Sequence, residues 1–153
     1  MKAAAAGPTM FLWALLLCVI VPPPSVAKPQ MTAADHLRRG VELGQKGDLE
    51  GAIAEFREAL RLKPDFADAH LNLGVALRDK GDLDGAIAEH RTALRLQPED
   101  AGAHYALGLA LTAKGDRREA AHAFREFLRL APNTPNNRQF IQKARALLRD
   151  LEE

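Results

Sequence analysis

Histidine side chains recur at a constant interval and are the residues best suited to metal or proton chemistry. His36, His70 and His104 are spaced by 34 residues. Imidazoles can bind Zn²⁺ or sense pH near neutrality. If each histidine lies on its own helical hairpin, however, neighbouring copies are separated by a helix-packing distance of roughly 8–10 Å. Because zinc ligands lie only ~2.0–2.1 Å from the ion, we expect the histidines to pack within their hairpins. A metal site and a pH switch are the two alternatives.

The sequence offers little for covalent catalysis. The only cysteine is Cys18 and the only serine is Ser25, and both lie in the N-terminal leader described below. Carboxylate pairs such as Glu55 and Glu58 recur at helix positions that a solvated surface explains. The glycines follow the interval of 34 residues instead of forming a phosphate-binding loop. We therefore predict a protein that is not an enzyme and needs no cofactor, metal or small-molecule substrate.

Composition excludes a further class of partner. Apolar residues make up 47% of the 153 residues, charged residues 27%, and the formal net charge is +1. This is the balance of an ordinary globular chain, and its length allows one domain. With so small a net charge there is no strong field to attract nucleic acid or an anionic membrane.

Residues 1–27 have the pattern of a secretory signal peptide. Lys2 precedes an apolar run over residues 10–21, which at ~1.5 Å per residue is too short to span a ~30 Å hydrocarbon core comfortably. Three prolines end this run, and small residues precede the bond between Ala27 and Lys28, where we expect cleavage. Acylation of Cys18 is disfavoured, because Leu17 stands where a small residue is required.

Export is the consequence of this leader. We expect a periplasmic bacterial protein that meets the membrane only transiently through its signal peptide. The extracellular medium, or anchoring by an uncleaved signal, are the alternatives. Residues 28–32 would form a short extended lead.

Three copies of one segment follow the lead. Gly47, Gly81 and Gly115 are spaced by 34 residues, and so are the prolines at 64, 98 and 132. In each copy an apolar helical pattern ends at the glycine, an aspartate caps a second helical pattern, and the proline closes it. The predicted copies occupy residues 33–66, 67–100 and 101–133. Two-helix hairpins of this kind bury their apolar faces by stacking in series.

The last segment, residues 134–153, differs from the repeat. Thr134 and Pro135 have the pattern of a helix start. Phe140 then begins a 4-3-4 apolar spacing that continues through Ala144, Leu147 and Leu151. We predict a single amphipathic helix that covers the end of the stack, with a membrane-surface helix as the alternative.

At these residues the chain resembles the tetratricopeptide repeat family. The motif residues that carry the resemblance are Gly40, Leu43, Ala52, Phe56 and Pro64 in the first copy; Leu73, Gly74, Leu77, Ala86 and Pro98 in the second; and Leu107, Gly108, Leu111, Ala120, Phe124 and Pro132 in the third. The chain departs from the family pattern at Arg39, at the three aligned histidines and at His90. The resemblance implies an all-α, right-handed α-solenoid of three helix–turn–helix hairpins with a terminal capping helix.

The resemblance also implies a concave groove lined by the first helix of each hairpin. Two apolar rows and two polar side chains are predicted to form the protein-binding surface: Leu37, Leu71 and Tyr105; Val41, Val75 and Leu109; and Asn72 with Arg78. If the rows are instead buried against neighbouring hairpins, they serve packing.

Chaperone-binding members of the family hold a peptide's terminal carboxylate with lysine, asparagine and arginine side chains. Here Asn72 matches one such position, whereas Leu37, Val41, Gly102 and Ala106 stand at the others. The resemblance therefore implies an apolar peptide or helix as ligand. We predict an exported adaptor or scaffold that binds another protein; a structural subunit of an envelope assembly, or a self-associating module, is the alternative.

Overall fold

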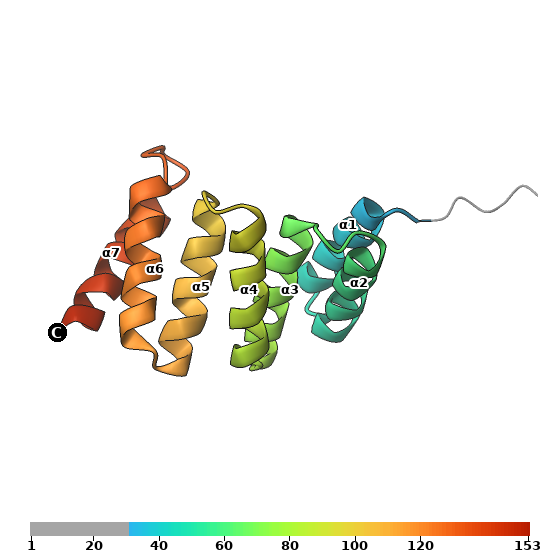
Figure 1. Ribbon diagram of the computed structural model, residues 1–153, viewed down its shortest axis with the longest axis horizontal. Helices are drawn as coiled ribbons and strands as arrows, with labels where there is room; N and C mark the ends of the chain where they lie inside the picture. The colour runs from blue at the N-terminus through green and yellow to red at the C-terminus, as the bar shows by residue number, and fades with distance from the viewer. Residues whose placement is uncertain (1–30) are drawn as a thin grey trace, which may run out of the picture. The chain divides into compact units, whose positions relative to one another are not determined.

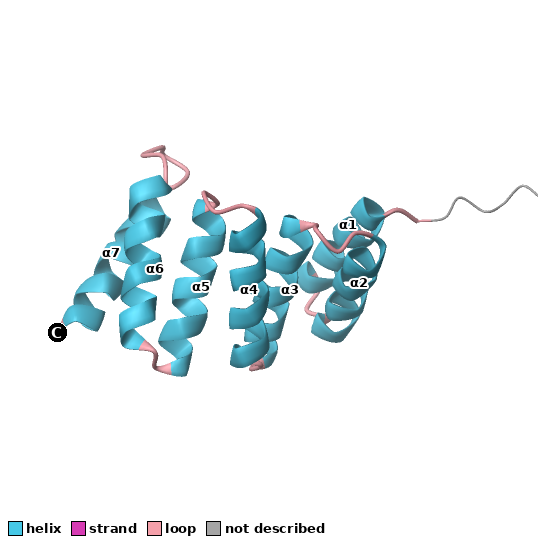
Figure 2. Ribbon diagram, viewed as in Figure 1, coloured by secondary structure: helices cyan, strands magenta, loops and turns pink. Residues whose placement is uncertain are grey.

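The structure is a computed structural model that describes residues 31–153, and every regular element in this range is a helix. The signal-peptide prediction, including cleavage between Ala27 and Lys28, lies outside the described residues. Figures 1 and 2 show these helices in chain order. They are α1 (Ala33–Gln45), α2 (Leu49–Leu62), α3 (Ala67–Lys80), α4 (Leu83–Leu96), α5 (Ala101–Lys114), α6 (Arg117–Leu130) and α7 (Arg138–Glu152). The fold is an all-α helical repeat, as the sequence predicts.

The helices pair into three hairpins, α1–α2, α3–α4 and α5–α6, and each hairpin packs on the next (Figure 1). The first helices of successive hairpins also touch, because α1 contacts α3 and α3 contacts α5. We call the surface formed by α1, α3 and α5 the inner face. It is the surface on which the sequence predicts the ligand to bind.

Each hairpin turn is built on the predicted glycine. Gly47, Gly81 and Gly115 have φ angles of 83°, 95° and 92°, a left-handed conformation that glycine adopts without the steric cost of a Cβ. The next amide, that of Asp82 for example, donates to the carbonyl of Leu77 at 2.9 Å and so satisfies the end of the helix. The turn thereby leads directly into the second helix of the hairpin.

Close contact within each hairpin depends on a glycine that faces an aromatic ring. A Cβ placed on Gly40 would lie 2.5 Å from Phe56, and one on Gly108 would lie 2.8 Å from Phe124. In the middle hairpin the ring that meets Gly74 belongs to His90. The two helices can approach this closely only because these glycines have no side chain.

The predicted start of the last helix was wrong. Pro135 lies in a turn in which the Asn137 amide donates to the Thr134 carbonyl at 3.1 Å, and α7 begins at Arg138. The Asn137 side chain also donates to the carbonyl of Pro132 at 3.1 Å. Proline is equally suited to the second position of a β-turn, and here the turn uses it.

The predicted apolar face of α7 also needs one correction. Ile141 and Ala144 are the buried residues of this helix, and Leu147 and Leu151 pack beside them. Phe140 is 48% exposed, and its ring lies 5.6 Å from that of Tyr105 in α5. The helix therefore covers the last hairpin as predicted, but it is rotated so that Ile141 leads the buried face. Among the described helices none is long and apolar enough to cross a membrane.

Candidate functional site on the inner face of α1, α3 and α5

The two predicted apolar rows lie on the inner helices, and all of their side chains are half-buried. Leu37, Val41, Tyr105 and Leu109 pack against the core of the stack. The large apolar residues that are most exposed in residues 31–153 lie elsewhere: Met31 at 38%, Leu62 at 43% and Phe140 at 48%. Each side chain of the two rows is therefore partly packed in the stack and partly exposed on the inner face.

A hollow of about 250 Å³ opens between α1 and α3, with α2 beneath it. We call it the Gly44 hollow, after the glycine that opens it. Its floor is apolar and its rim carries the polar side chains of Gln45, Asn72 and Asp79. Its lining residues are Gly40, Val41, Gly44, Gln45, Leu49, Ala52, Phe56, Asn72, Val75, Ala76 and Asp79. Three of the predicted binding residues (Val41, Asn72 and Val75) therefore meet at one concave place.

The hollow exists because Gly44 has no side chain. A Cβ built on Gly44 would have only one neighbour within 4 Å, the Cβ of Ala52 at 3.8 Å, so a side chain here would extend into free space. One repeat later the equivalent position holds Arg78. The sequence analysis named Val41, Asn72 and Val75 but missed Gly44, although the difference between Gly44 and Arg78 at equivalent places of the repeat could have identified it.

Arg78 lies at the equivalent place between α3 and α5. Its side chain is only 24% exposed, and its guanidinium donates to Asp79 Oδ1 from Nε at 3.0 Å and from Nη2 at 2.6 Å. Desolvation, and then the positive charge of Arg78, lower the pKa of His90 in α4. Burial raises the pKa of Tyr105 in α5, and the charge of Arg78 partly offsets that rise. Arg78 thus lies near both the second and the third hairpin, and its charge is paired with that of Asp79.

Tyr105 is the centre of an aromatic cluster at the end of the inner face. Its ring lies 5.9 Å from Phe124, 5.0 Å from Phe127 and 5.6 Å from Phe140 between centroids, in tilted or edge-to-face arrangements. Burial raises the pKa of the Tyr105 hydroxyl. A hollow of about 260 Å³ adjoins this cluster between α5 and the start of α7. Tyr105 therefore joins the inner face to the capping helix.

The arginines of α1 and α3 are paired with carboxylates. Arg38 lies 2.8 Å from Asp35, and Arg39 lies 3.2 Å from Glu55. Together with the pair that Arg78 makes, these contacts leave the inner face close to neutral. Asn72 donates from its side chain to the carbonyl of Asp68 at 2.7 Å, which leaves its side-chain oxygen available as an acceptor.

The aligned histidines hydrogen-bond within their own surroundings. His36 Nδ1 lies 2.6 Å from Glu55 in α2, and His70 Nδ1 lies 2.6 Å from Glu89 in α4. His104 bonds the carbonyl of Pro98 at 3.0 Å. In residues 31–153 no three His, Cys, Asp or Glu side chains are grouped to hold a metal ion. The contacts of His36 and His70 with these carboxylates lie within their hairpins, whereas His104 bonds the loop that precedes its hairpin.

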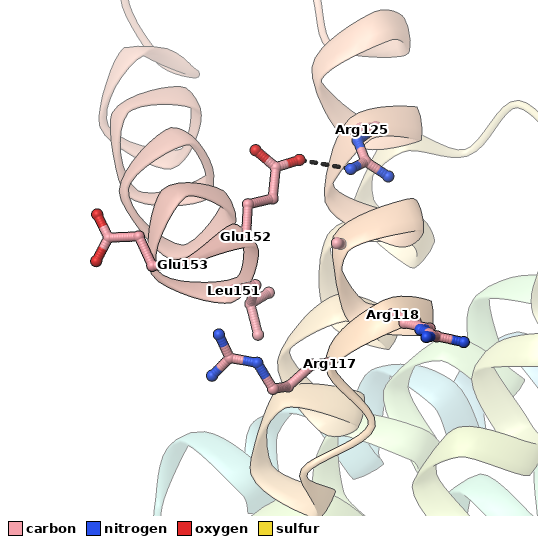
Figure 3. Close-up of a pocket in the computed structure, with 7 residues that line it drawn as sticks. Arg117, Arg118, Arg125, Leu151, Glu152 and Glu153 are labelled. Carbon is pink, nitrogen blue, oxygen red and sulfur yellow. Dashed lines mark hydrogen bonds and ion pairs between the residues drawn. The ribbon is translucent and has the colours of Figure 1, made fainter.

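A larger hollow, of about 870 Å³, lies at the other end of α6 against the last residues of α7 (Figure 3). Arg117 donates to the carbonyl of Asp150 at 2.7 Å, and Arg125 pairs with Glu152. Figure 3 shows Arg125 directed toward Glu152 while Arg118 points away from α7. These contacts fasten α7 to α6, so we assign this basic end a structural role.

Sequence comparison assigns the repeats to one family. Two family models, both described as tetratricopeptide repeat, match residues 37–101 and residues 101–134. Between them they cover the three hairpins from Leu37 to Thr134. No curated protein matches the chain.

Several solved structures have a similar fold at low sequence identity. The first tetratricopeptide domain of Spaghetti (RPAP3), bound to the HSP90 peptide SRMEEVD, aligns with a TM-score of 0.72 and 20% identity over 79% of this chain and 90% of that one. The TPR2B domain of yeast Sti1, in a complex with pHsp70, aligns with a TM-score of 0.73 and 20% identity over 80% of this chain and 98% of that one. The Yersinia enterocolitica type III secretion chaperone SycD, in complex with a peptide of the translocator YopD, aligns with a TM-score of 0.73 and 18% identity over 78% of this chain and 91% of that one. At these identities the likeness establishes the fold.

Proposed function

Because the chain belongs to the tetratricopeptide repeat family, we propose that it is a non-catalytic adaptor whose inner face binds a segment of another protein. The observation that carries the proposal is the concave Gly44 hollow, where an apolar floor and a polar rim meet on the inner face. Ligand sites are typically concave and mostly apolar, with a few polar groups that fix orientation. The similar domains of Spaghetti and SycD, which hold peptides, support the same class of ligand.

The charge pattern distinguishes this surface from one that holds an acidic chain end. The peptide in the Spaghetti complex ends in Glu-Glu-Val-Asp. On α1 and α3 of the present chain, Arg38, Arg39 and Arg78 each have a carboxylate partner. A terminal carboxylate would meet cations whose charge is already compensated by these partners, so we propose a ligand without a required acidic end.

Export is part of the proposal. The predicted signal peptide over residues 1–27 supports a site of action in the periplasm, with the extracellular medium and an uncleaved anchor as alternatives. N-terminal sequencing of the exported protein tests it: a mature chain that begins at Lys28 is expected, and one that begins at Met1 would contradict cleavage.

Selection from a displayed peptide library tests the adaptor proposal, followed by fluorescence anisotropy with the selected peptides. Leu71→Asp places a charge on the inner face and should abolish binding while circular dichroism stays unchanged. Ala54→Asp, on the exposed side of α2, changes the net charge by the same amount as Leu71→Asp and should bind as the wild type does. Equal binding by Leu71→Asp and the wild type would overturn inner-face binding.

Self-association is the second candidate, and exposed Phe140 is the observation that favours it. Light scattering during gel filtration separates the two candidates. A concentration-dependent dimer that Phe140→Ser abolishes would favour the structural-subunit alternative, whereas a monomer at all concentrations favours the adaptor.

A further inference from the structure

The three copies of the repeat differ at one position that shapes the inner face. This position holds Gly44 in α1, Arg78 in α3 and Thr112 in α5. Gly44 leaves a hollow, Arg78 brings a half-buried guanidinium that acts on α4 and α5, and Thr112 donates to the Gly108 carbonyl of its own helix at 2.8 Å. Only the first of these arrangements leaves room for a side chain from outside.

The walls of the Gly44 hollow define what fits. Val41, Ala52, Phe56 and Val75 present carbon atoms, and Phe56 itself is 3% exposed and fixed against Gly40. An occupant that buries an apolar side chain here would gain roughly the free energy of its area removed from water, ~25 cal/mol per Å². A charged side chain would gain no partner from these carbon atoms and would lose its water.

The rim of the hollow suits a peptide backbone. Gln45 and Asn72 stand on opposite helices, and their amides can donate to or accept from a main chain that passes over the opening. Asp79, also on the rim, already accepts two hydrogen bonds from Arg78. The rim is therefore polar but presents no unpaired cation.

We propose that the Gly44 hollow is a specificity pocket that takes one apolar side chain, of leucine, methionine or phenylalanine size, from an extended segment of the partner protein. The segment needs no free carboxyl end, and Arg78 prevents a second pocket of this kind between α3 and α5. This inference rests on the proposed function, since it assigns the inner face its anchor residue. The volume, the apolar floor, the amide rim and the paired arginines all favour this occupant.

The test fills the hollow and removes the anchor in turn. The probe is a peptide selected by display on the full protein, together with variants in which each residue is changed to alanine. One apolar residue should weaken binding by about tenfold to a hundredfold when changed. Gly44→Leu should weaken the parent peptide by a similar factor, and in that variant the alanine change at the anchor should have little further effect.

Two further variants at Gly44 distinguish a blocked pocket from a destabilised fold. Gly44→Ala adds only a methyl group at 3.8 Å from Ala52, so it should fold at least as stably and bind within about threefold of the wild type. Gly44→Arg copies the residue that the next repeat carries and should block the pocket as Gly44→Leu does. Each variant is checked by circular dichroism and thermal unfolding before binding is measured.

The outcomes separate the pocket from the groove. Additive losses from Gly44→Leu and the anchor change, or unchanged binding by both Gly44→Leu and Gly44→Arg, would overturn the pocket while leaving inner-face binding in place. Inner-face binding and the pocket are both supported if Leu71→Asp loses binding and if the affinity losses from Gly44→Leu and from the anchor change are not additive. If Leu71→Asp binds normally, the groove itself is not the site and the pocket proposal fails with it.

Discussion

His90 is the residue whose chemistry fits its surroundings least. It stands one repeat from Phe56 and one from Phe124, and its ring is fully buried against Gly74. Neither ring nitrogen has a hydrogen-bond partner in the described part of the chain. Desolvation, and then the charge of Arg78, lower its pKa to about 4. The histidine is therefore held neutral at a cost in stability.

Replacing this histidine by the residue of the other two repeats should stabilise the protein. His90→Phe removes two buried unsatisfied nitrogens and should raise the free energy of unfolding by roughly 1–3 kcal/mol. Urea unfolding at pH 7 measures it. The reciprocal change Phe56→His should destabilise the first hairpin, and a destabilised His90→Phe would show that the middle hairpin cannot accept the larger ring.

The same residue predicts a pH dependence with a definite sign. Between its ordinary value of 6.5 and its folded value of about 4, the unfolded chain binds a proton that the folded chain does not. The free energy of unfolding should therefore fall as the pH drops from 6.5 toward 4, by about 3 kcal/mol from this group, and not change further below 4. Urea unfolding across this range compares the wild type with His90→Phe. The gap between the two curves should widen on acidification, and parallel curves would contradict the prediction.

Among the elements, the second helices of the hairpins differ in how they begin. Asp48 and Asp82 accept a hydrogen bond from the amide three residues on, that of Gly51 and Gly85, at 2.9 Å. A Cβ at Gly51 would lie 2.4 Å from the Asp48 carboxylate, so glycine permits this close cap. In the third hairpin Glu119 replaces the glycine, and Asp116 makes no cap but lies 3.6 Å from Lys114.

Removing the aspartates should therefore have unequal effects. Asp48→Ala is expected to lower the free energy of unfolding by about 1 kcal/mol, the usual value of an N-cap hydrogen bond. Asp116→Ala should lower it by less than half as much, because no cap is lost. Thermal and urea unfolding measure both, and equal effects would mean that the caps are not the source of the difference.

Across the whole molecule, stability depends on covering the open end of the stack. The third hairpin has no fourth hairpin beside it in the described residues, and α7 takes that place. Ile141 and Ala144 supply the buried contact, while Phe140 stays at the edge beside Tyr105. Terminal units of repeat proteins serve this purpose.

Ile141→Ala should consequently destabilise the protein by about 2–4 kcal/mol, because it opens a cavity under α7. Phe140→Ala should cost much less, since the ring is half exposed. Urea unfolding followed by circular dichroism tests the pair. If Phe140→Ala lowers the free energy of unfolding more than Ile141→Ala does, the buried face of α7 is the one led by Phe140, as the sequence pattern predicts.

The hairpins could be predicted from sequence because the signals that form them are local. A glycine at the turn, an aspartate after it and apolar residues at helical spacing determine each helix through neighbours a few residues away. The start of α7 could not be predicted in this way, because Thr134 and Pro135 suit a helix start and a β-turn equally well. The rotation of α7 toward Ile141 depends on the surface of α6, which lies across a loop.

The sequence by itself determined the fold class and the period, and its family resemblance implied which helices line the inner face. Only the tertiary structure decided that the apolar rows are half-buried, that the inner arginines are paired and that Gly44 opens a hollow. A hollow is the space that several helices together leave unfilled. The missing side chain of Gly44 therefore produces a hollow only when α1, α2 and α3 are packed around it. The same packing decided the contacts of the repeated histidines: His36 and His70 bond Glu55 and Glu89 within their hairpins, whereas His104 bonds the Pro98 carbonyl of the preceding loop.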